Sequence, residues 1–94
     1  MRDTPYATEI RTARDASGQT IERIFVKDCK REEIRFSWWN NGTMVTRPLD
    51  LPEEELLPLM CEAIRKGVFS PAFLKGLHEA LYDEQVSKTN AQGT

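Results

Sequence analysis

The residues best suited to binding a ligand are two adjacent tryptophans in the stretch RFSWWNNGT, which spans residues 35–43. An indole ring can stack on a nucleic-acid base, and basic side chains beside it neutralise the phosphates of a single strand. Basic residues come close to Trp39 if the flanking segments form a sheet. The resulting candidate nucleic-acid-binding set is Arg11, Arg14, Arg23, Lys27, Arg35, Trp39 and Arg47.

Residues that carry out catalysis or hold a metal are sparse. His78 is the single histidine, and no serine or cysteine is placed by the sequence as its nucleophile. Cys29 and Cys61 stand far apart, so they predict two reduced thiols rather than half of a zinc site. Three glutamates at 53–55 suit the positive end of a helix dipole without a cation. The sequence therefore predicts a protein that is not an enzyme and that uses no cofactor or metal.

The chain of 94 residues has room for one domain, 1–94, in which we expect order over about 8–85 and a polar tail over 86–94. A chain this short buries a modest share of its surface, so pairing with a second copy is expected. Residues 1–49 carry nine Lys/Arg and seven Asp/Glu, whereas residues 50–94 carry four and eight. This weakly basic first half suits a local anionic ligand but not a dedicated duplex-DNA binder.

Hydropathy argues against a membrane role. No apolar run approaches the roughly 20 residues that span a bilayer. The first residues lack the apolar stretch of a signal peptide. We therefore expect no membrane association and a cytoplasmic location.

Four strands are expected to position the candidate residues, after a loose N-terminal end of six or seven residues. Turn chemistry at Asp15–Gly18 separates the first two strands, and a charged connector at 28–32 separates the second from the third. Asn41-Gly42 predicts a type I′ hairpin turn between the last two, because both residues tolerate positive φ. The expected strands are 8–14, 20–27, 33–39 and 43–49.

The Asn41-Gly42 turn also predicts a register. Trp39 then pairs with Met44 and Trp38 with Val45, and continuing the ladder pairs Phe36 with Arg47 and Ile34 with Leu49. One face collects Ile34, Phe36, Trp38, Val45 and Leu49, and the other collects Arg35, Ser37, Trp39, Met44 and Thr46. We therefore predict that Trp38 is a core residue. Trp39, on the outer face, either contacts a ligand or packs against a second subunit or the second helix.

Two helices are expected to follow the strands. The first begins at Asp50-Leu51-Pro52-Glu53, where Asp50 is a candidate cap, and ends at Gly67. Pro58 lies inside it and either kinks this helix or delays its regular part. Ser70-Pro71 caps the second helix, which runs to about Glu84 with Phe69 and Leu74 as a hydrophobic staple. The predicted fold is an α+β domain, a four-stranded antiparallel sheet followed by two helices (ββββαα).

Short motifs in this order resemble the small transcriptional coactivators called positive cofactor four. They are VKDCK at 26–30, IRFSWW at 34–39, Gly42, Met44 and LPEEELLPLMCEAI at 51–64, and the resemblance covers about residues 20–66. Members of that family have a V-basic-D-x-K strand end, an I-R-x-x-W strand, a Gly-containing hairpin and an amphipathic helix. The resemblance implies a curved four-stranded sheet, a homodimer formed through the helix, and single-stranded DNA held by the sheets.

Two classes of function remain open from the sequence. The first is a non-enzymatic nucleic-acid-associated protein, such as a transcription regulator, that binds single-stranded DNA through a sheet face bearing Trp and Arg. The alternative is a small protein-interaction module, a regulator or inhibitor, that docks on another protein through its acidic helical half or the Trp39 face. A steep loss of affinity with salt would distinguish the first from the second.

Overall fold

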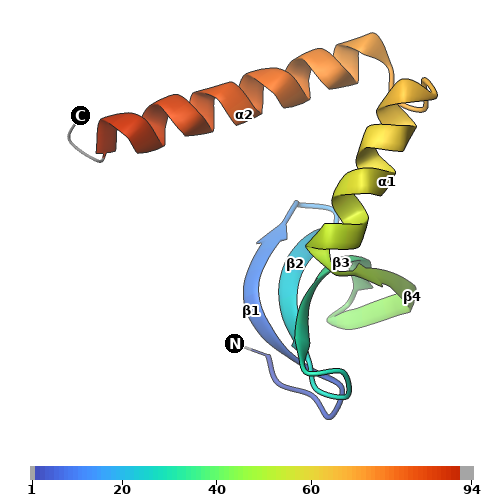
Figure 1. The fold of residues 1–94 in the computed structure, drawn as a ribbon. Helices are drawn as coiled ribbons and strands as arrows, with labels where there is room; N and C mark the ends of the chain where they lie inside the picture. Colours follow the sequence, from blue (N-terminus) through green and yellow to red (C-terminus); the bar gives the residue numbers. More distant parts are fainter. Residues whose placement is uncertain (1, 92–94) are drawn as a thin grey trace. The chain divides into compact units, whose positions relative to one another are not determined.

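The computed structural model describes the backbone of residues 2–91 and the side chains of residues 2–44, 48–86 and 88. It confirms the α+β class, with an antiparallel sheet in the order β1-β2-β3-β4 followed by two helices (Figure 1). The elements are β1 (Ala7–Arg14), β2 (Gln19–Val26), β3 (Arg31–Asn40), β4 (Thr43–Leu51), α1 (Glu53–Arg65) and α2 (Pro71–Ala91). The chain divides into two compact units, 1–58 and 59–94.

The turn between β3 and β4 has the predicted conformation. Asn41 and Gly42 both adopt positive φ, 51° and 78°, which a type I′ turn requires. The pairs Trp39–Met44 and Trp38–Val45 are confirmed. The register therefore starts as the sequence predicts.

Farther from the turn, the predicted register is wrong by two residues. Phe36 pairs with Leu49 rather than with Arg47, and Ile34 pairs with Leu51 rather than with Leu49, because β4 has an irregularity opposite Ser37. Pro48 lies in this irregular stretch, and proline has no N–H to give to a sheet ladder. A shift of two residues keeps every side chain on its predicted face.

The predicted choice of buried face is wrong. The buried residues of the sheet form one face, the inner face, which consists of Ala7, Thr20, Glu22, Ile24, Val26, Glu33 and Arg35. The opposite face is largely apolar and open to solvent; this aromatic face consists of Ile21, Phe25, Ile34, Phe36, Trp38 and Leu49. Trp38, predicted to be a core residue, is 52% exposed.

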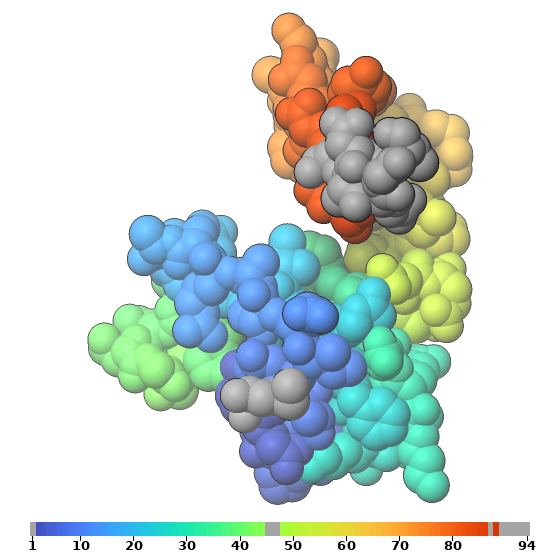
Figure 2. Space-filling model, turned by 90° about the vertical axis from the view of Figure 1, so that its left-hand side faces the viewer, coloured from blue at the N-terminus to red at the C-terminus, as the bar shows by residue number. Residues whose placement is uncertain are grey.

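The N-terminal segment explains why a charged face is buried. Arg2 donates two hydrogen bonds of 2.8 Å to the carboxylate of Glu22, whose side chain has no exposed surface. The Tyr6 hydroxyl donates to Asp50, and Thr8 pairs with Asp3. The segment lies against β1 at the surface in Figure 2, in dark blue. The expectation of a loose N-terminal end is therefore wrong, because Arg2 supplies the partner that the buried carboxylate of Glu22 needs.

The helix boundaries follow local signals, with two corrections. Gly67 adopts a positive φ of 73°, and the Val68 N–H donates to the Ala63 carbonyl, so α1 ends in the Schellman motif that the glycine predicts. Asp50, the predicted cap, lies instead in β4 and binds Arg35. In α2 the Ser70 hydroxyl accepts from the Phe73 N–H, which confirms this cap.

The second correction concerns the end of α2. The helix continues to Ala91 rather than ending near Glu84. The ring of Phe69 contacts that of Phe73, with centroids 5.0 Å apart, and the staple between Phe69 and Leu74 stays a prediction. Pro58 lies within α1, whose helical assignment is continuous from Glu53 to Arg65.

Candidate functional site

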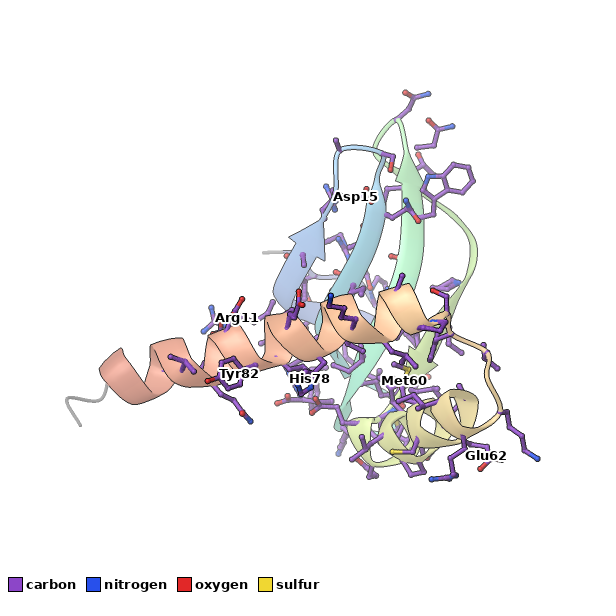
Figure 3. The ribbon with its side chains drawn as sticks, turned by 90° about the horizontal axis from the view of Figure 1, so that it is seen from above. Arg11, Asp15, Met60, Glu62, His78 and Tyr82 are labelled. Carbon is purple, nitrogen blue, oxygen red and sulfur yellow. The ribbon has the colours of Figure 1, made fainter. Side chains whose placement is uncertain are left out.

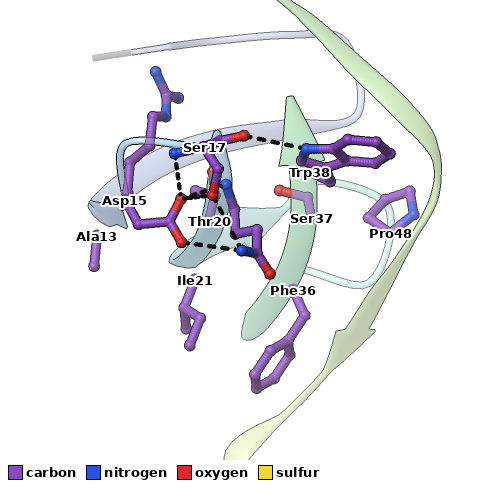
Figure 4. Close-up of a pocket in the computed structure, with 11 residues that line it drawn as sticks. Ala13, Asp15, Ser17, Thr20, Ile21, Phe36, Ser37, Trp38 and Pro48 are labelled. Carbon is purple, nitrogen blue, oxygen red and sulfur yellow. Dashed lines mark hydrogen bonds between the residues drawn. The ribbon is translucent and has the colours of Figure 1, made fainter. Parts of the chain in front are cut away.

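A groove of about 1040 Å³ opens beside Trp38 on the aromatic face (Figure 4). Ile21 and Phe36, which pair directly across β2 and β3, supply apolar lining. Asp15 and Gln19, from the turn between β1 and β2 and the start of β2, supply polar lining. The groove therefore combines an apolar surface with a polar end.

Trp38 is exposed but fixed in position. Its indole N–H donates a 3.2 Å hydrogen bond to the carbonyl of Ser17 (Figure 4). The turn itself is held against the neighbouring strand, because the Trp39 N–H donates to the Gly18 carbonyl at 2.9 Å. Gly18 adopts a φ of 91°, and a Cβ there would collide with the Trp39 carbonyl oxygen. A large, solvent-accessible aromatic ring is thereby held in one orientation.

Asp15 organises the polar end of the groove. Its Oδ1 accepts from the backbone N–H groups of Ser17 at 3.0 Å and Gln19 at 2.9 Å, and its Oδ2 accepts from the Gln19 side-chain amide at 3.1 Å. The backbone N–H of Gln19, followed by the bonds from Ser17, lowers the pKa of the Asp15 carboxyl below its ordinary value. The carboxylate is therefore charged at neutral pH.

Trp39 lies on the opposite side of the sheet, in a different setting from the one predicted. The guanidinium carbon of Arg2 lies 4.5 Å from the centroid of its ring, and that of Arg14 lies 5.5 Å away. Its indole N–H donates to the Ser37 hydroxyl at 3.1 Å. Both distances fall within the range of cation–π contacts, and the ring is only partly exposed. The prediction that Trp39 is the ring on the open face is wrong; that ring is Trp38.

Three of the predicted basic residues are already paired with carboxylates. Arg35 donates to Asp50 at 2.8 and 3.0 Å, and those bonds raise the pKa of its guanidinium. Arg23 binds Glu53 at 2.6 Å and Glu32 at 2.9 Å, which likewise raises its pKa. Lys27 lies 2.8 Å from Asp3. These three cations are less available to phosphate than the sequence suggested.

Arg11 and Arg14 are exposed, and neither forms an ion pair with another side chain that the structure describes. Arg14 lines the groove beside Trp38, and Arg11 pairs with Arg23 in the ladder between β1 and β2. The side chain of Arg47 lies outside the described residues. The other six predicted residues are thus divided between the two faces of the sheet.

Sequence reasoning missed Trp38, Phe36 and Gln19 as candidate ligand-contacting residues. The first two were assigned to the core because they share an apolar face, and Gln19 had no pattern to mark it. A signal was present in β2, where both faces carry apolar residues and the sequence gives no unique choice of buried face.

The described residues contain neither a group of ligands that could hold a metal ion nor a helix long and apolar enough to cross a membrane. Comparison of the chain with protein-family models, curated proteins and solved structures finds no significant match. The chemistry of the groove and of the aromatic face therefore provides the basis for a functional proposal.

Proposed function

We propose that the aromatic face binds single-stranded nucleic acid, with the exposed ring of Trp38 as its main stacking platform. The observation that carries this proposal is a half-exposed indole, fixed by a hydrogen bond to Ser17, at the edge of a groove. A ring held in one orientation loses little conformational freedom when a base stacks on it. Such a stack contributes roughly 1–3 kcal/mol.

The arrangement of the other aromatic residues supports the same ligand. Phe36 lies two residues before Trp38 on β3, so their side chains leave the same face roughly 7 Å apart along the strand. Phe25, on β2, belongs to that face as well and is partly exposed. Several rings on one open face are suited to successive bases of an extended strand, and every base has a face that can stack.

The charges on the aromatic face favour a ligand whose binding depends little on the neutralisation of phosphates. Arg11 lies on the aromatic face, where its ladder partner Arg23 is shared with two carboxylates. The guanidinium of Arg14 lies against the ring of Trp39, on the opposite side of the sheet. Stacking would therefore contribute more to affinity than phosphate neutralisation does. With about one phosphate neutralised, the logarithm of the binding constant should fall with log salt concentration with a slope of about −0.7.

The resemblance to positive cofactor four favours the same residue. The I-R-x-x-W pattern runs from Ile34 to Trp38 in this sequence. The tryptophan of the pattern is therefore the exposed Trp38 and not Trp39, whose ring contacts Arg2 and Arg14. This correspondence supports a non-enzymatic role in nucleic-acid metabolism, such as transcription regulation.

A fluorescence titration with a short single-stranded oligonucleotide, repeated at two salt concentrations, tests the proposal. We expect quenching of tryptophan emission at low salt and a shallow salt slope. A duplex of the same sequence is the control and should bind more weakly, because its bases are already stacked on one another. Absence of binding by the single strand at low salt would refute the proposal.

A second candidate function, protein association, is favoured by the state of the helices. In the part of the chain that the structure describes, α1 and α2 contain no buried residue. His78 and Tyr82 project from one side of α2, one turn apart (Figure 3). Within the unit 59–94, large apolar side chains exposed on or beside the helices are Leu59, Ile64, Val68, Phe73, Leu81, Tyr82 and Val86. We propose that a second copy of the chain, or another protein, covers this surface, since apolar area of this kind marks an interface.

A further inference from the structure

The amide of Gln19 has a fixed orientation at the polar end of the groove. Its Nε2 donates to Asp15 Oδ2 at 3.1 Å and to Ser17 Oγ at 3.2 Å (Figure 4). An ionised carboxylate only accepts hydrogen bonds, so the amide must present its NH₂ group to Asp15. The carbonyl oxygen, Oε1, is therefore directed away from that contact, and it accepts no hydrogen bond from a side chain that the structure describes.

This acceptor lies next to the stacking ring. Gln19 and Trp38 are direct partners in the ladder between β2 and β3, and both line the groove. The side chains of directly opposed residues start about 5 Å apart on the same face. A base stacked on Trp38 would therefore bring one of its edges within reach of the amide of Gln19.

The polar side chains of the turn around that position offer acceptors rather than free donors. Arg14 also lines the groove, but its guanidinium carbon lies 5.5 Å from the ring of Trp39, on the opposite side of the sheet. The Gln19 carbonyl and the Asp15 carboxylate are acceptors, and the N–H of Trp38 is already used by Ser17. Cytosine and adenine present an exocyclic amino donor where thymine, uracil and guanine present a carbonyl oxygen. At the position of the exocyclic group, a carbonyl oxygen would face like partial charges, whereas an amino group would find a partner.

Building on the proposed function, we propose that Gln19, held by Asp15, selects cytosine or adenine over uracil or thymine for the base that stacks on Trp38. Gln19 is the contacting residue and Asp15 is a positioning residue. The preference is limited to one position of the bound strand, because the other rings of the aromatic face have no comparable fixed polar group beside them among the described lining residues.

The role of Asp15 as a positioning residue predicts that Asp15→Asn changes the base preference. Its Oδ1 accepts from two backbone N–H groups, so in Asp15→Asn the oxygen of the introduced amide must keep that place. The introduced NH₂ group then replaces Oδ2 and faces Gln19. Gln19 must rotate its amide to offer a carbonyl to that donor, which turns its own NH₂ toward the base. A donor at this place should favour the carbonyl edge of uracil.

The test compares oligodeoxycytidine with oligodeoxyuridine of equal length at pH 7.5 and one salt concentration. These bases have the same ring size and neither carries a methyl group. The comparison therefore tests only the polar groups on their hydrogen-bonding edges. We expect the wild type to bind the cytidine strand about three- to tenfold more tightly, the value of one hydrogen bond. In Gln19→Met the ratio should fall to about one, and in Asp15→Asn it should invert.

The outcomes separate this inference from the proposed function. Equal affinity of the wild type for the two strands, or an unchanged ratio in Gln19→Met, would refute the inference while leaving single-strand binding in place. Failure of both strands to bind would refute the proposed function and the inference with it. Gln19→Met keeps the backbone hydrogen bonds of Asp15, so it decides the question even if Asp15→Asn unfolds.

Discussion

Removal of the Arg2 side chain should destabilise the protein far more than removal of a partly exposed side chain usually does. Glu22 has no exposed side-chain surface, and its carboxylate accepts two hydrogen bonds of 2.8 Å from Arg2 and one of 3.0 Å from Thr12. Arg2→Ala leaves that buried charge with a single hydroxyl donor. Breaking a buried ion pair in this way costs about 3–5 kcal/mol. Because the Arg2 side chain is 28% exposed and water can partly replace it, we expect about 3 kcal/mol.

Urea denaturation followed by circular dichroism measures this loss as a shift of the midpoint. Arg23→Ala is the matched control, since Arg23 pairs with two carboxylates that are both more than half exposed. Such a surface pair contributes about 0–1 kcal/mol. A double variant, Arg2→Met with Glu22→Leu, should recover much of the stability, because no unpaired charge remains. A loss in Arg2→Ala no larger than that in Arg23→Ala would refute the assignment of the charged face to the interior.

Three further predictions follow from the same geometry. Trp38→Ala should lower the free energy of unfolding by about 2 kcal/mol in urea titrations, because half of this residue is exposed. Truncation of a buried aromatic residue costs roughly 3–5 kcal/mol, and a loss of that magnitude would contradict the exposure of Trp38. The pKa of the Asp15 carboxyl is lowered in the folded protein. Its contribution to the free energy of unfolding is therefore complete above the unfolded pKa of about 3.9 and is lost as pH falls through the folded pKa. The thermal midpoint of the wild type should therefore approach that of Asp15→Ala as pH is lowered from 6 to 3, and a constant difference would contradict this linkage. Sedimentation equilibrium should show self-association that Phe73→Glu and Leu81→Glu reduce, since both side chains are exposed on α2; identical molar masses for wild type and variants would count against the helical surface.

Local signals predicted the elements well. The Asn41-Gly42 turn, the Gly67 helix end and the Ser70 cap each depend on residues close together in the chain, so the sequence alone contains the cause. The same reasoning placed Ile34, Phe36, Trp38 and Leu49 on one face correctly, because alternation along a strand is independent of what covers it.

The choice of the buried face could not be predicted in this way. It depends on Arg2 reaching Glu22, twenty residues along the chain, and on Arg35 reaching Asp50. Without those pairs a face that carries Glu22, Glu33 and Arg35 would be too costly to bury, so hydropathy favours the opposite assignment. The environment of Trp39 has the same origin, since Arg2 also covers its ring.

The choice of the buried face also decides which tryptophan belongs to the candidate site. The sequence placed the two tryptophans on opposite faces of the sheet, but it selected Trp39 as the open ring where the structure exposes Trp38. The polar end of the groove depends on the side-chain network of Asp15, Ser17 and Gln19, whose geometry follows from the turn conformation rather than from any motif.

The most direct test of the account is the affinity of Trp38→Ala for a labelled single-stranded oligonucleotide, measured by fluorescence anisotropy at low salt. Leu57→Ala is the control, because Leu57 is also large, apolar and exposed but lies on α1. If Trp38 is the stacking platform, Trp38→Ala should bind about 5- to 150-fold more weakly, the equivalent of roughly 1–3 kcal/mol, while Leu57→Ala binds like the wild type. Wild-type affinity in Trp38→Ala would contradict the central claim.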